Sequence, residues 1–254
     1  MIAPSRMAMI AACALSLTAP AARALDLDNM SPAEQEAFGA AVRSYLLENP
    51  EVILEAVDVL EQQQAQADAA RDDALVTANL QELQDDGYSW VGGNPEGDIT
   101  LVEFMDYRCG YCRKAAPEIE ALLAADDNIR FVIKEFPILG EASVLSSRFA
   151  IATRLVAGDD AYKDIHDTLI AFQGEPNEVA MRRMAEGLSL DADAIFAKMD
   201  APEVTEQLQR TRRLAQTLSI SGTPTFVLEQ DMLRGYLPAD QIQIMIEEIR
   251  AGRS

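Results

Sequence analysis

The sequence is short of cysteine, histidine and positive charge. Its 254 residues include three cysteines, one histidine and one tryptophan, and 21 Lys and Arg stand against 42 Asp and Glu, for a formal charge of −21. So large a negative charge argues against binding to nucleic acid or anionic lipid, because both carry the same sign. A structural zinc site needs four Cys or His ligands, which this chain does not supply. After residue 24 no apolar run is long enough to cross a bilayer.

The first 24 residues have the parts of a cleaved secretory signal. Arg6 precedes the apolar run MAMIAACALSLTAP, and Ala22-Arg23-Ala24 places small residues at −3 and −1 of a cleavage site. Cys13 follows a stretch that resembles a lipoprotein cleavage box, but the apolar run continues beyond it. We therefore expect a mature chain that begins near Leu25 with two cysteines. Its compartment is expected to be oxidising, which in a Gram-negative cell is the periplasm.

Residues 25–87 are predicted to form an all-α N-terminal extension. Ser31 and Pro32 provide a cap and first turn, and Asn49-Pro50 separates this helix from a second one. From Glu51 to Asp86 the chain has no Gly or Pro, and the first half of that stretch is apolar while the second is small and polar. A helix of this kind cannot bury its own apolar half. It either lies against the main domain or forms an oligomerisation stalk, and its spacing fits both.

The rest of the chain alternates between strand and helix patterns. GYSWVGGNPEG marks a domain boundary. Strands are predicted at 99–105, 129–136, 225–228 and 232–236, and helices at 109–125, 141–157, 160–172, 177–187, 191–199, 202–218 and 238–250. This order predicts an α/β fold in which residues 88–140 and 220–254 share one sheet and residues 141–219 form an inserted helical subdomain.

Cys109 and Cys112 form a C-x-x-C pair where a strand pattern becomes a helix pattern. A disulfide that closes so short a loop stabilises the fold little. Redox exchange suits the pair better, because a helix N-terminus favours the Cys109 thiolate and Cys112 follows one turn later on the inner face. We expect Cys109 to be the exposed nucleophile and Cys112 the resolving thiol.

Several residues near the pair have unusual chemistry for their positions. The basic residues expected to support the thiolate are Arg108, Arg113 and Lys114, and Asp106 opposes them. Glu103 interrupts the apolar strand ITLVEFM, where a buried carboxylate is costly unless it has a task such as moving the proton of Cys112; the alternative is an edge-strand acid that faces water. Pro224 has no N–H and suits the start of a strand. His166 is expected to be a partly exposed helix residue.

The motifs VEFMDYRCGYC and SGTPTFV, with a helical block between them, resemble the DsbA-like branch of the thioredoxin superfamily over residues 88–254. This resemblance implies a thioredoxin fold. It also implies that Cys109 is the nucleophile, that Cys112 resolves the mixed disulfide, and that Glu103 is the buried acid of the family.

The same resemblance assigns the substrate contacts. It implies a cis peptide bond before Pro224 and a client backbone bound by Thr223 as an added strand. Gly110 and Tyr111, which adjoin the nucleophile, stand where strongly oxidising members have Pro-His, so a less depressed thiol pKa and a less oxidising couple are expected. Cys-Gly-Tyr-Cys with Thr before the proline is most similar to disulfide isomerases and ScsC-type suppressor-of-copper-sensitivity proteins. Some of these oligomerise through an N-terminal helical extension, which favours the stalk.

Together these features predict a secreted thiol–disulfide oxidoreductase with isomerase or reductase leaning. No cofactor is expected beyond the Cys109–Cys112 disulfide. The expected partners are unfolded or misoxidised secreted proteins, a membrane redox partner and further copies of the chain in a trimer or dimer. The alternatives are a DsbA-like dithiol oxidase, a Cu(I) binder that uses both thiolates and an oligomeric holdase.

Overall fold

The computed structural model describes residues 29–253, so the signal segment and Cys13 lie outside the described residues. The helices are α1 (Pro32–Glu48), α2 (Glu51–Ala78), α3 (Leu80–Gln84), α4 (Gly110–Ala125), α5 (Glu141–Ala157), α6 (Asp159–Ala171), α7 (Glu178–Gly187), α8 (Ala192–Met199), α9 (Pro202–Thr217) and α10 (Ala239–Gly252). The strands are β1 (Trp90–Gly93), β2 (Ile99–Met105), β3 (Ile129–Glu135), β4 (Thr225–Leu228) and β5 (Asp231–Arg234). None of the described helices is long and apolar enough to span a membrane. The chain divides into two units between Glu61 and Gln62.

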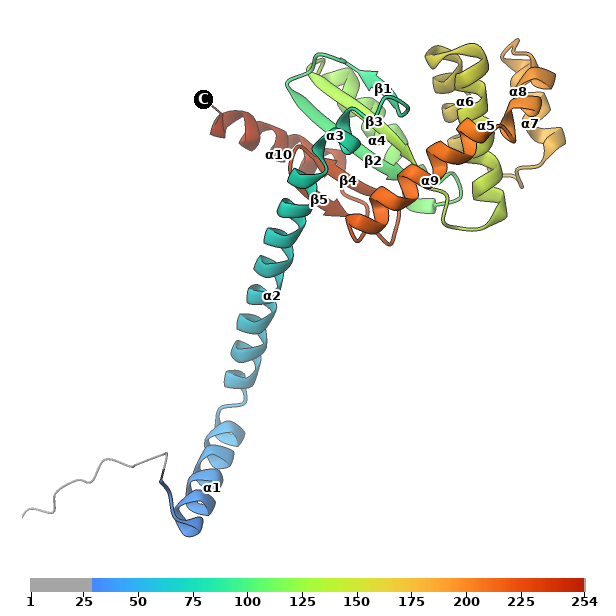
Figure 1. The fold of residues 1–254 in the computed structure, drawn as a ribbon. Helices are drawn as coiled ribbons and strands as arrows, with labels where there is room; N and C mark the ends of the chain where they lie inside the picture. Colours follow the sequence, from blue (N-terminus) through green and yellow to red (C-terminus); the bar gives the residue numbers. More distant parts are fainter. Residues whose placement is uncertain (1–28, 254) are drawn as a thin grey trace, which may run out of the picture. The chain divides into compact units, whose positions relative to one another are not determined.

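The second unit is built on one mixed sheet with strand order β1-β3-β2-β4-β5 (Figure 1). β2 and β3 run parallel, and the other neighbours are antiparallel. Because β4 is antiparallel to β2, its first residue lies at the edge where β2 ends, with Thr225 opposite Phe104. The chain that leaves β2 and the chain that enters β4 therefore meet at the same edge of the sheet.

Both faces of the sheet are covered, which explains why every residue of β2 is buried. On one face Leu101 and Met105 pack with α4, α10 and the helices of the insertion. On the other face Val102 and Phe104 pack with the end of α2, α3 and α9. A strand covered on both sides needs a nearly continuous apolar sequence, and ITLVEFM provides one apart from its threonine and glutamate.

Five helices, α5 to α9, lie between β3 and β4, each within one residue of the predicted bounds. They confirm the predicted helical insertion. The prediction for His166 on α6 was wrong, because this residue is only 7% exposed. Its ring packs between Tyr107, with ring centroids 5.5 Å apart, and Tyr162 at 6.0 Å.

Two features between residues 51 and 97 differ from the sequence analysis. The helix that begins at Glu51 ends at Ala78, and α3 starts after a break at Asn79, whose side-chain amide donates to the Leu75 carbonyl. Residues 90–93, within the stretch read as a turn-rich boundary, form β1 against β3. Gly93 at its end has φ +62°, and a Cβ there would lie 2.3 Å from the backbone oxygen of Ile129, so only glycine fits.

The first unit contains α1 and the beginning of α2, and within residues 29–61 no side chain is buried. A capping box fixes the start of α1: Ser31 accepts from the Glu34 N–H, and the Glu34 carboxylate accepts from the Ser31 N–H. The large apolar side chains left exposed are Phe38, Val42, Tyr45, Leu47, Ile53, Leu54, Val57, Val59 and Leu60. We call this set the apolar surface of the extension.

The rest of α2 belongs to the second unit. Val76 and Leu83 are fully buried in its core. Lys134, also fully buried, donates to the Asp86 carboxylate at 2.5 Å and to the Glu82 carbonyl at 2.7 Å. The sequence analysis placed the boundary of the extension at residue 87. The boundary between the two units lies further upstream, between Glu61 and Gln62.

Candidate active site

The turn between β2 and α4 places the cysteines and is organised by Asp106. This fully buried carboxylate accepts N–H bonds from Arg108 at 2.8 Å, Ile138 at 2.8 Å and Leu139 at 3.0 Å. Its backbone oxygen accepts from the Cys109 N–H at 3.0 Å. These bonds offset the cost of burying the charge and join the turn before Cys109 to the loop after β3.

Cys109 is the N-cap of α4, and its thiol is held by two hydrogen bonds. Sγ accepts from the Cys112 N–H at 3.4 Å, and in its protonated form the thiol donates to the Thr223 carbonyl at 3.1 Å. A hydrogen bond from the Cys112 thiol lowers the pKa of Cys109 to about 5, with help from Thr223 and the backbone of Cys112 and Tyr111, although burial acts in the opposite direction. Cys109 is therefore a thiolate at neutral pH without a histidine in the pair.

Two expectations about the surroundings of Cys109 were wrong. The nucleophile is recessed rather than exposed, since only 7% of its surface is accessible. The basic residues near it engage other groups: Arg108 pairs with Glu175, Arg113 donates to the Tyr107 carbonyl, and the Lys114 ammonium lies over the Tyr236 ring. Hydrogen bonds rather than a paired cation therefore stabilise this thiolate.

Cys112 has the opposite electrostatic environment. It is 1% exposed on the inner face of α4. Its hydrogen bond to Cys109, its burial and the nearby charge of Glu103 all raise the pKa of its thiol far above the ordinary value. Both cysteines are free thiols in this structure. One is thus ready to attack, and the other holds its proton until a base takes it.

Glu103 is the carboxyl group whose charge acts on the Cys112 thiol. Side chains alternate along β2, so Glu103 shares the face of Leu101 and Met105, where the cysteines also pack. It is 5% exposed in a central strand, which rejects the alternative of an edge-strand acid facing water. Burial, then the charges of Cys109 and Glu135, raise the pKa of Glu103 to about 8. Within residues 29–253 no group donates a hydrogen bond to this carboxyl group, so it is free to exchange a proton.

The loop before β4 lies beside the cysteines, as its antiparallel pairing with β2 requires. The Thr223–Pro224 peptide bond is cis. The carbonyl of Thr223 faces Cys109, and that of Pro224 accepts from the Gly235 N–H at 3.0 Å. A pocket of about 260 Å³ opens here, lined by residues 221–225, Arg234 and Gly235. Thr223, whose carbonyl faces Cys109, is one of the residues that line this pocket.

Gly110 and Tyr111 lie at the surface of the pair. A Cβ on Gly110 would meet nothing within 4 Å, so the approach to Cys109 is open on this side. Tyr111 is 62% exposed, and its ring stacks on that of Tyr236 with centroids 6.0 Å apart and planes at 28°. Tyr236 in turn donates to the Glu118 carboxylate at 2.6 Å. Sequence reasoning found Tyr111 but missed Tyr236, which lies 125 residues further along the chain.

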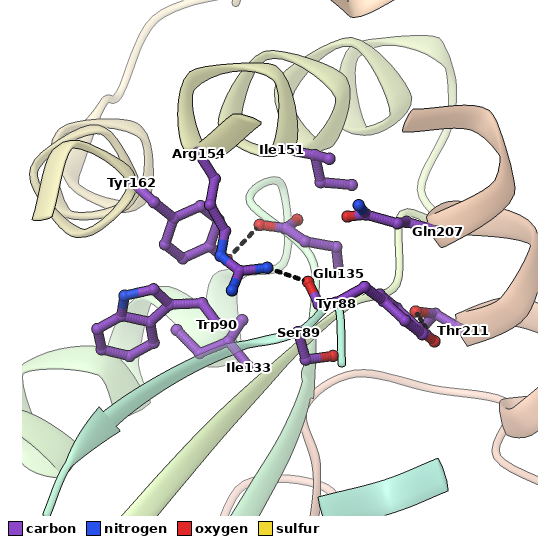
Figure 2. A pocket seen from close by; sticks show the side chains of 10 residues that line it. All are labelled: Tyr88, Ser89, Trp90, Ile133, Glu135, Ile151, Arg154, Tyr162, Gln207 and Thr211. Atoms are coloured by element: carbon purple, nitrogen blue, oxygen red, sulfur yellow. Dashed lines mark hydrogen bonds between the residues drawn. The ribbon is translucent and has the colours of Figure 1, made fainter. Parts of the chain in front are cut away.

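A second buried acid, Glu135, was given no role by the sequence analysis. It accepts hydrogen bonds from Tyr107 at 2.8 Å, Tyr162 at 2.7 Å and Ser147 at 2.6 Å. Figure 2 shows Glu135 and Tyr162 at the wall of an internal cavity of about 10 Å³, too small for a client or an organic cofactor. A signal in the sequence was available. Glu135 ends the largely apolar strand IRFVIKE, just as Glu103 interrupts the apolar strand ITLVEFM.

Two family models match the chain. A DSBA-like thioredoxin domain matches residues 100–247. The N-terminal domain of the copper resistance protein ScsC matches residues 34–67, which cover α1 and the apolar part of α2.

Solved structures and curated proteins give further similarities. A thioredoxin-like oxidoreductase from Silicibacter pomeroyi is 40% identical, with 67% of this chain and 97% of that chain covered and a TM-score of 0.63. BcfH from Salmonella enterica is 29% identical, with 85% and 95% covered and a TM-score of 0.71. Among curated proteins, the Na(+)/H(+) antiporter NhaA 3 of Salinispora tropica is 32% identical over 136 residues, 54% of this chain and 21% of that protein. The chain spans about a fifth to a quarter of the length of the antiporters that it matches.

Proposed function

The chain belongs to the DSBA-like thioredoxin domain family, and we propose that it is a protein thiol–disulfide oxidoreductase with a leaning towards disulfide isomerisation. The observation that carries this proposal is the asymmetry of the pair. Cys109 has a pKa of about 5, while the pKa of Cys112 is raised by the same hydrogen bond. An exchange catalyst needs one thiol that attacks at neutral pH and a second that waits for the mixed disulfide.

In the first step, the Cys109 thiolate attacks one sulfur of a client disulfide. A bond forms between Sγ of Cys109 and that sulfur, the client disulfide breaks, and its other sulfur leaves as a thiolate. The open side at Gly110 gives the client access, and the Thr223 backbone aligns the client segment beside the pocket before β4. In an isomerase, a different cysteine thiolate of the same client attacks the client sulfur of the mixed disulfide, which forms a new client disulfide and returns Cys109 as a thiolate.

The second step releases a client that does not rearrange. Glu103 accepts the proton of Cys112, and the resulting thiolate attacks Sγ of Cys109. The client leaves as a thiol with two electrons gained, and Cys109 and Cys112 are oxidised to a disulfide. With a pKa of about 8, the ionised Glu103 is a stronger base than an ordinary carboxylate. Its pKa is therefore closer to that of the thiol whose proton it accepts.

The N-terminal extension supports the isomerase leaning. Its apolar surface matches the region of the ScsC N-terminal domain, and a helix with no buried residue gains most of its stability from a partner. We propose that copies of the chain associate through this surface into a trimer or dimer that gathers several Cys109 sites around one client. The proposed clients are misoxidised secreted proteins in the periplasm, and a membrane redox partner would return the Cys109–Cys112 disulfide to dithiol.

The protonation of Cys112 makes the copper alternative less favoured. Cu(I) binds thiolates, and the raised pKa of Cys112 means that binding must displace a strongly held proton. Exchange needs only one thiolate at a time. A dithiol oxidase would use the same residues. The two functions are distinguished by whether the protein oxidises reduced ribonuclease or reactivates scrambled ribonuclease.

The test is reactivation of scrambled ribonuclease, run beside oxidation of reduced ribonuclease. We expect efficient reactivation by the protein, loss of it in Cys109→Ser, and accumulation of mixed disulfides with the client in Cys112→Ser. A chain that begins at Gln62 keeps the second unit whole and is expected to lose reactivation while it still reduces a small disulfide. Fast oxidation that the truncation does not affect would instead establish a DsbA-like oxidase. Client protection that survives loss of both cysteines would establish a holdase.

A further inference from the structure

Glu103 and Glu135 lie on the same face of two adjacent strands. In the parallel pairing of β2 with β3, Glu103 is opposite Ile133 and Met105 is opposite Glu135. Side chains two positions apart share a face, so the two carboxyl groups project to the same side of the sheet. Glu103 is 5% exposed and Glu135 is 6% exposed. Two acids so placed, with little water between them, repel each other when both are ionised.

Glu135 is held by hydroxyl groups instead of a cation. Its donors come from three different parts of the chain: Tyr107 in the turn before Cys109, Ser147 on α5 and Tyr162 on α6. No Lys, Arg or His of the described chain forms an ion pair with it, because Lys134 turns to Asp86 and Arg154 bonds Asp159 and the Tyr88 carbonyl. Three donors favour the ionised carboxylate, while burial favours the neutral acid.

The other titratable groups around the two acids come from every element packed against them. They are Cys109 and Cys112 at α4, Asp106 and Tyr107 in the turn, Tyr162 and His166 on α6, and Arg154 on α5. Burial lowers the pKa of His166 to about 4, so this ring is neutral and contributes no compensating charge at neutral pH. The ionised groups that face Glu103 are therefore anionic: the Cys109 thiolate and Glu135.

We propose that Glu135 is a positioning residue of the exchange reaction, whose negative charge keeps the proton on Glu103 while Cys109 is a thiolate. This inference rests on the proposed function and adds a second acid to it. When Cys109 enters the mixed disulfide its charge disappears, which lowers the pKa of Glu103. Glu103 then releases its proton to solvent water, with Glu135 as its remaining anionic neighbour. The Glu103 carboxylate formed next to that charge is a stronger base, and it accepts the proton of Cys112 only after the client is attached.

The directions of the pKa values agree with this order. Burial raises the pKa of Glu135 to about 7, against its three hydroxyl donors, and that of Glu103 to about 8 with Glu135 among the causes. Three hydroxyl donors favour the ionised form of Glu135, whereas no group within residues 29–253 donates to Glu103, so Glu135 ionises first as the pH rises. Removing the charge of Glu135 would lower the pKa of Glu103, and Glu103 would be ionised at a lower pH in every state of the enzyme.

The experiment measures release of a model peptide from a mixed disulfide formed with Cys109 of the full chain, followed across pH 5–9. Glu135→Gln is expected to move the midpoint of the release rate to lower pH by on the order of one unit. The carboxyl ¹³C shift of Glu103 should report a pKa lowered by a similar amount. In a Glu103→Gln background, Glu135→Gln should no longer move the midpoint.

Ser147→Ala and Tyr162→Phe are milder variants that test the same effect. Each keeps the Glu135 carboxyl group but removes one donor, which raises the pKa of Glu135 and reduces its charge at neutral pH. Each is expected to shift the midpoint in the same direction by a smaller amount, and they carry the test if Glu135→Gln does not fold. Folded variants with an unchanged midpoint or an unchanged Glu103 pKa would overturn the proposal. If Glu103→Gln alone leaves the release rate and its pH profile unchanged, the failure lies with Glu103 as the base in the proposed function.

Discussion

Apolar side chains have opposite fates in the two units of this chain. In β2 seven consecutive residues are buried, a glutamate among them, whereas the seventeen residues of α1 include no buried side chain. The second unit covers its apolar residues with its own helices and leaves room for buried acids that do chemistry. The first unit presents its apolar residues outward, and nothing within residues 29–61 covers them. Stability in one unit is internal, and in the other we propose that it comes from association.

The largest expected effect comes from placing negative charges on the apolar surface of the extension. Tyr45→Glu with Leu47→Glu should reduce the mass measured by light scattering to that of a monomer, because charged side chains at the contact are costly to bury. Reactivation of scrambled ribonuclease should fall to background, while reduction of a small disulfide should be unchanged. Arg43→Glu, an exposed change on the same helix, is the control and should leave the mass as it is. An unchanged mass in the double variant would remove the basis for the oligomer.

The ion pair of Lys134 with Asp86 tests the internal stability of the second unit. Lys134→Met should leave the buried Asp86 carboxylate without its cation, with only the Tyr88 and Ser89 donors, and lower the free energy of unfolding by about 3–5 kcal/mol in a denaturant titration. The pair Lys134→Met with Asp86→Asn should recover most of this loss, since no lone charge remains. An equal loss in single and double variants would show that the charge pairing is not what matters. The same contact means that a truncation near Gly87 would damage the core, so the comparison of units needs a chain that begins at Gln62.

Much of the catalytic unit could be predicted because its determinants are local. The interrupted strand ITLVEFM, the cysteine spacing and the helical periods of α5 to α9 each depend on neighbours in the sequence. Thr223 and Cys109 are 114 residues apart, and they meet only because β4 runs antiparallel to β2. Periodicity cannot show that pairing, and the position of Thr223 was inferred from the family resemblance alone.

The errors share one cause. Arg108, Arg113 and Lys114 were expected to support the thiolate because they are close in sequence, but each found a partner elsewhere in the fold. His166 was expected to be a partly exposed helix residue, yet the face that carries it packs on Tyr107 and Tyr162. Which face of a helix is covered, and by what, depends on tertiary contacts that no local pattern contains. The break at Asn79 also belongs to this class, because a helical pattern continues through it.

Glu103 provides a smaller effect with a definite sign. Its folded pKa, about 8, lies above the value near 4.5 of an unfolded glutamate, so ionisation favours the unfolded state as the pH rises between these values. In the disulfide form, where Cys109 carries no charge, we expect the chain to lose unfolding free energy through this group between pH 5 and pH 8, by less than the roughly 4 kcal/mol that corresponds to three full pH units. Glu103→Gln should remove that loss and be relatively more stable at pH 8. Parallel stability profiles for the two proteins would contradict the burial of an ionisable Glu103.

The smallest expected effect concerns Tyr111, a large ring that is exposed beside the nucleophile. Its stack on Tyr236 holds it in place, and an aromatic pair contributes about 0.5–1.5 kcal/mol. Tyr236→Leu should therefore lower kcat/KM for a protein client by about two- to tenfold, with the change mainly in KM, because the ring contacts the client and not the reacting sulfurs. Reduction of a small disulfide, which does not reach Tyr111, is the internal control. Glu186→Gln, an exposed change on α7, should affect neither substrate. An equal loss on both substrates would mean that Tyr236 acts on Cys109 and not on the client. In that case the exposed ring would be part of the packing of the unit. It would not be a contact for another chain, which is the role proposed for the apolar surface of the extension.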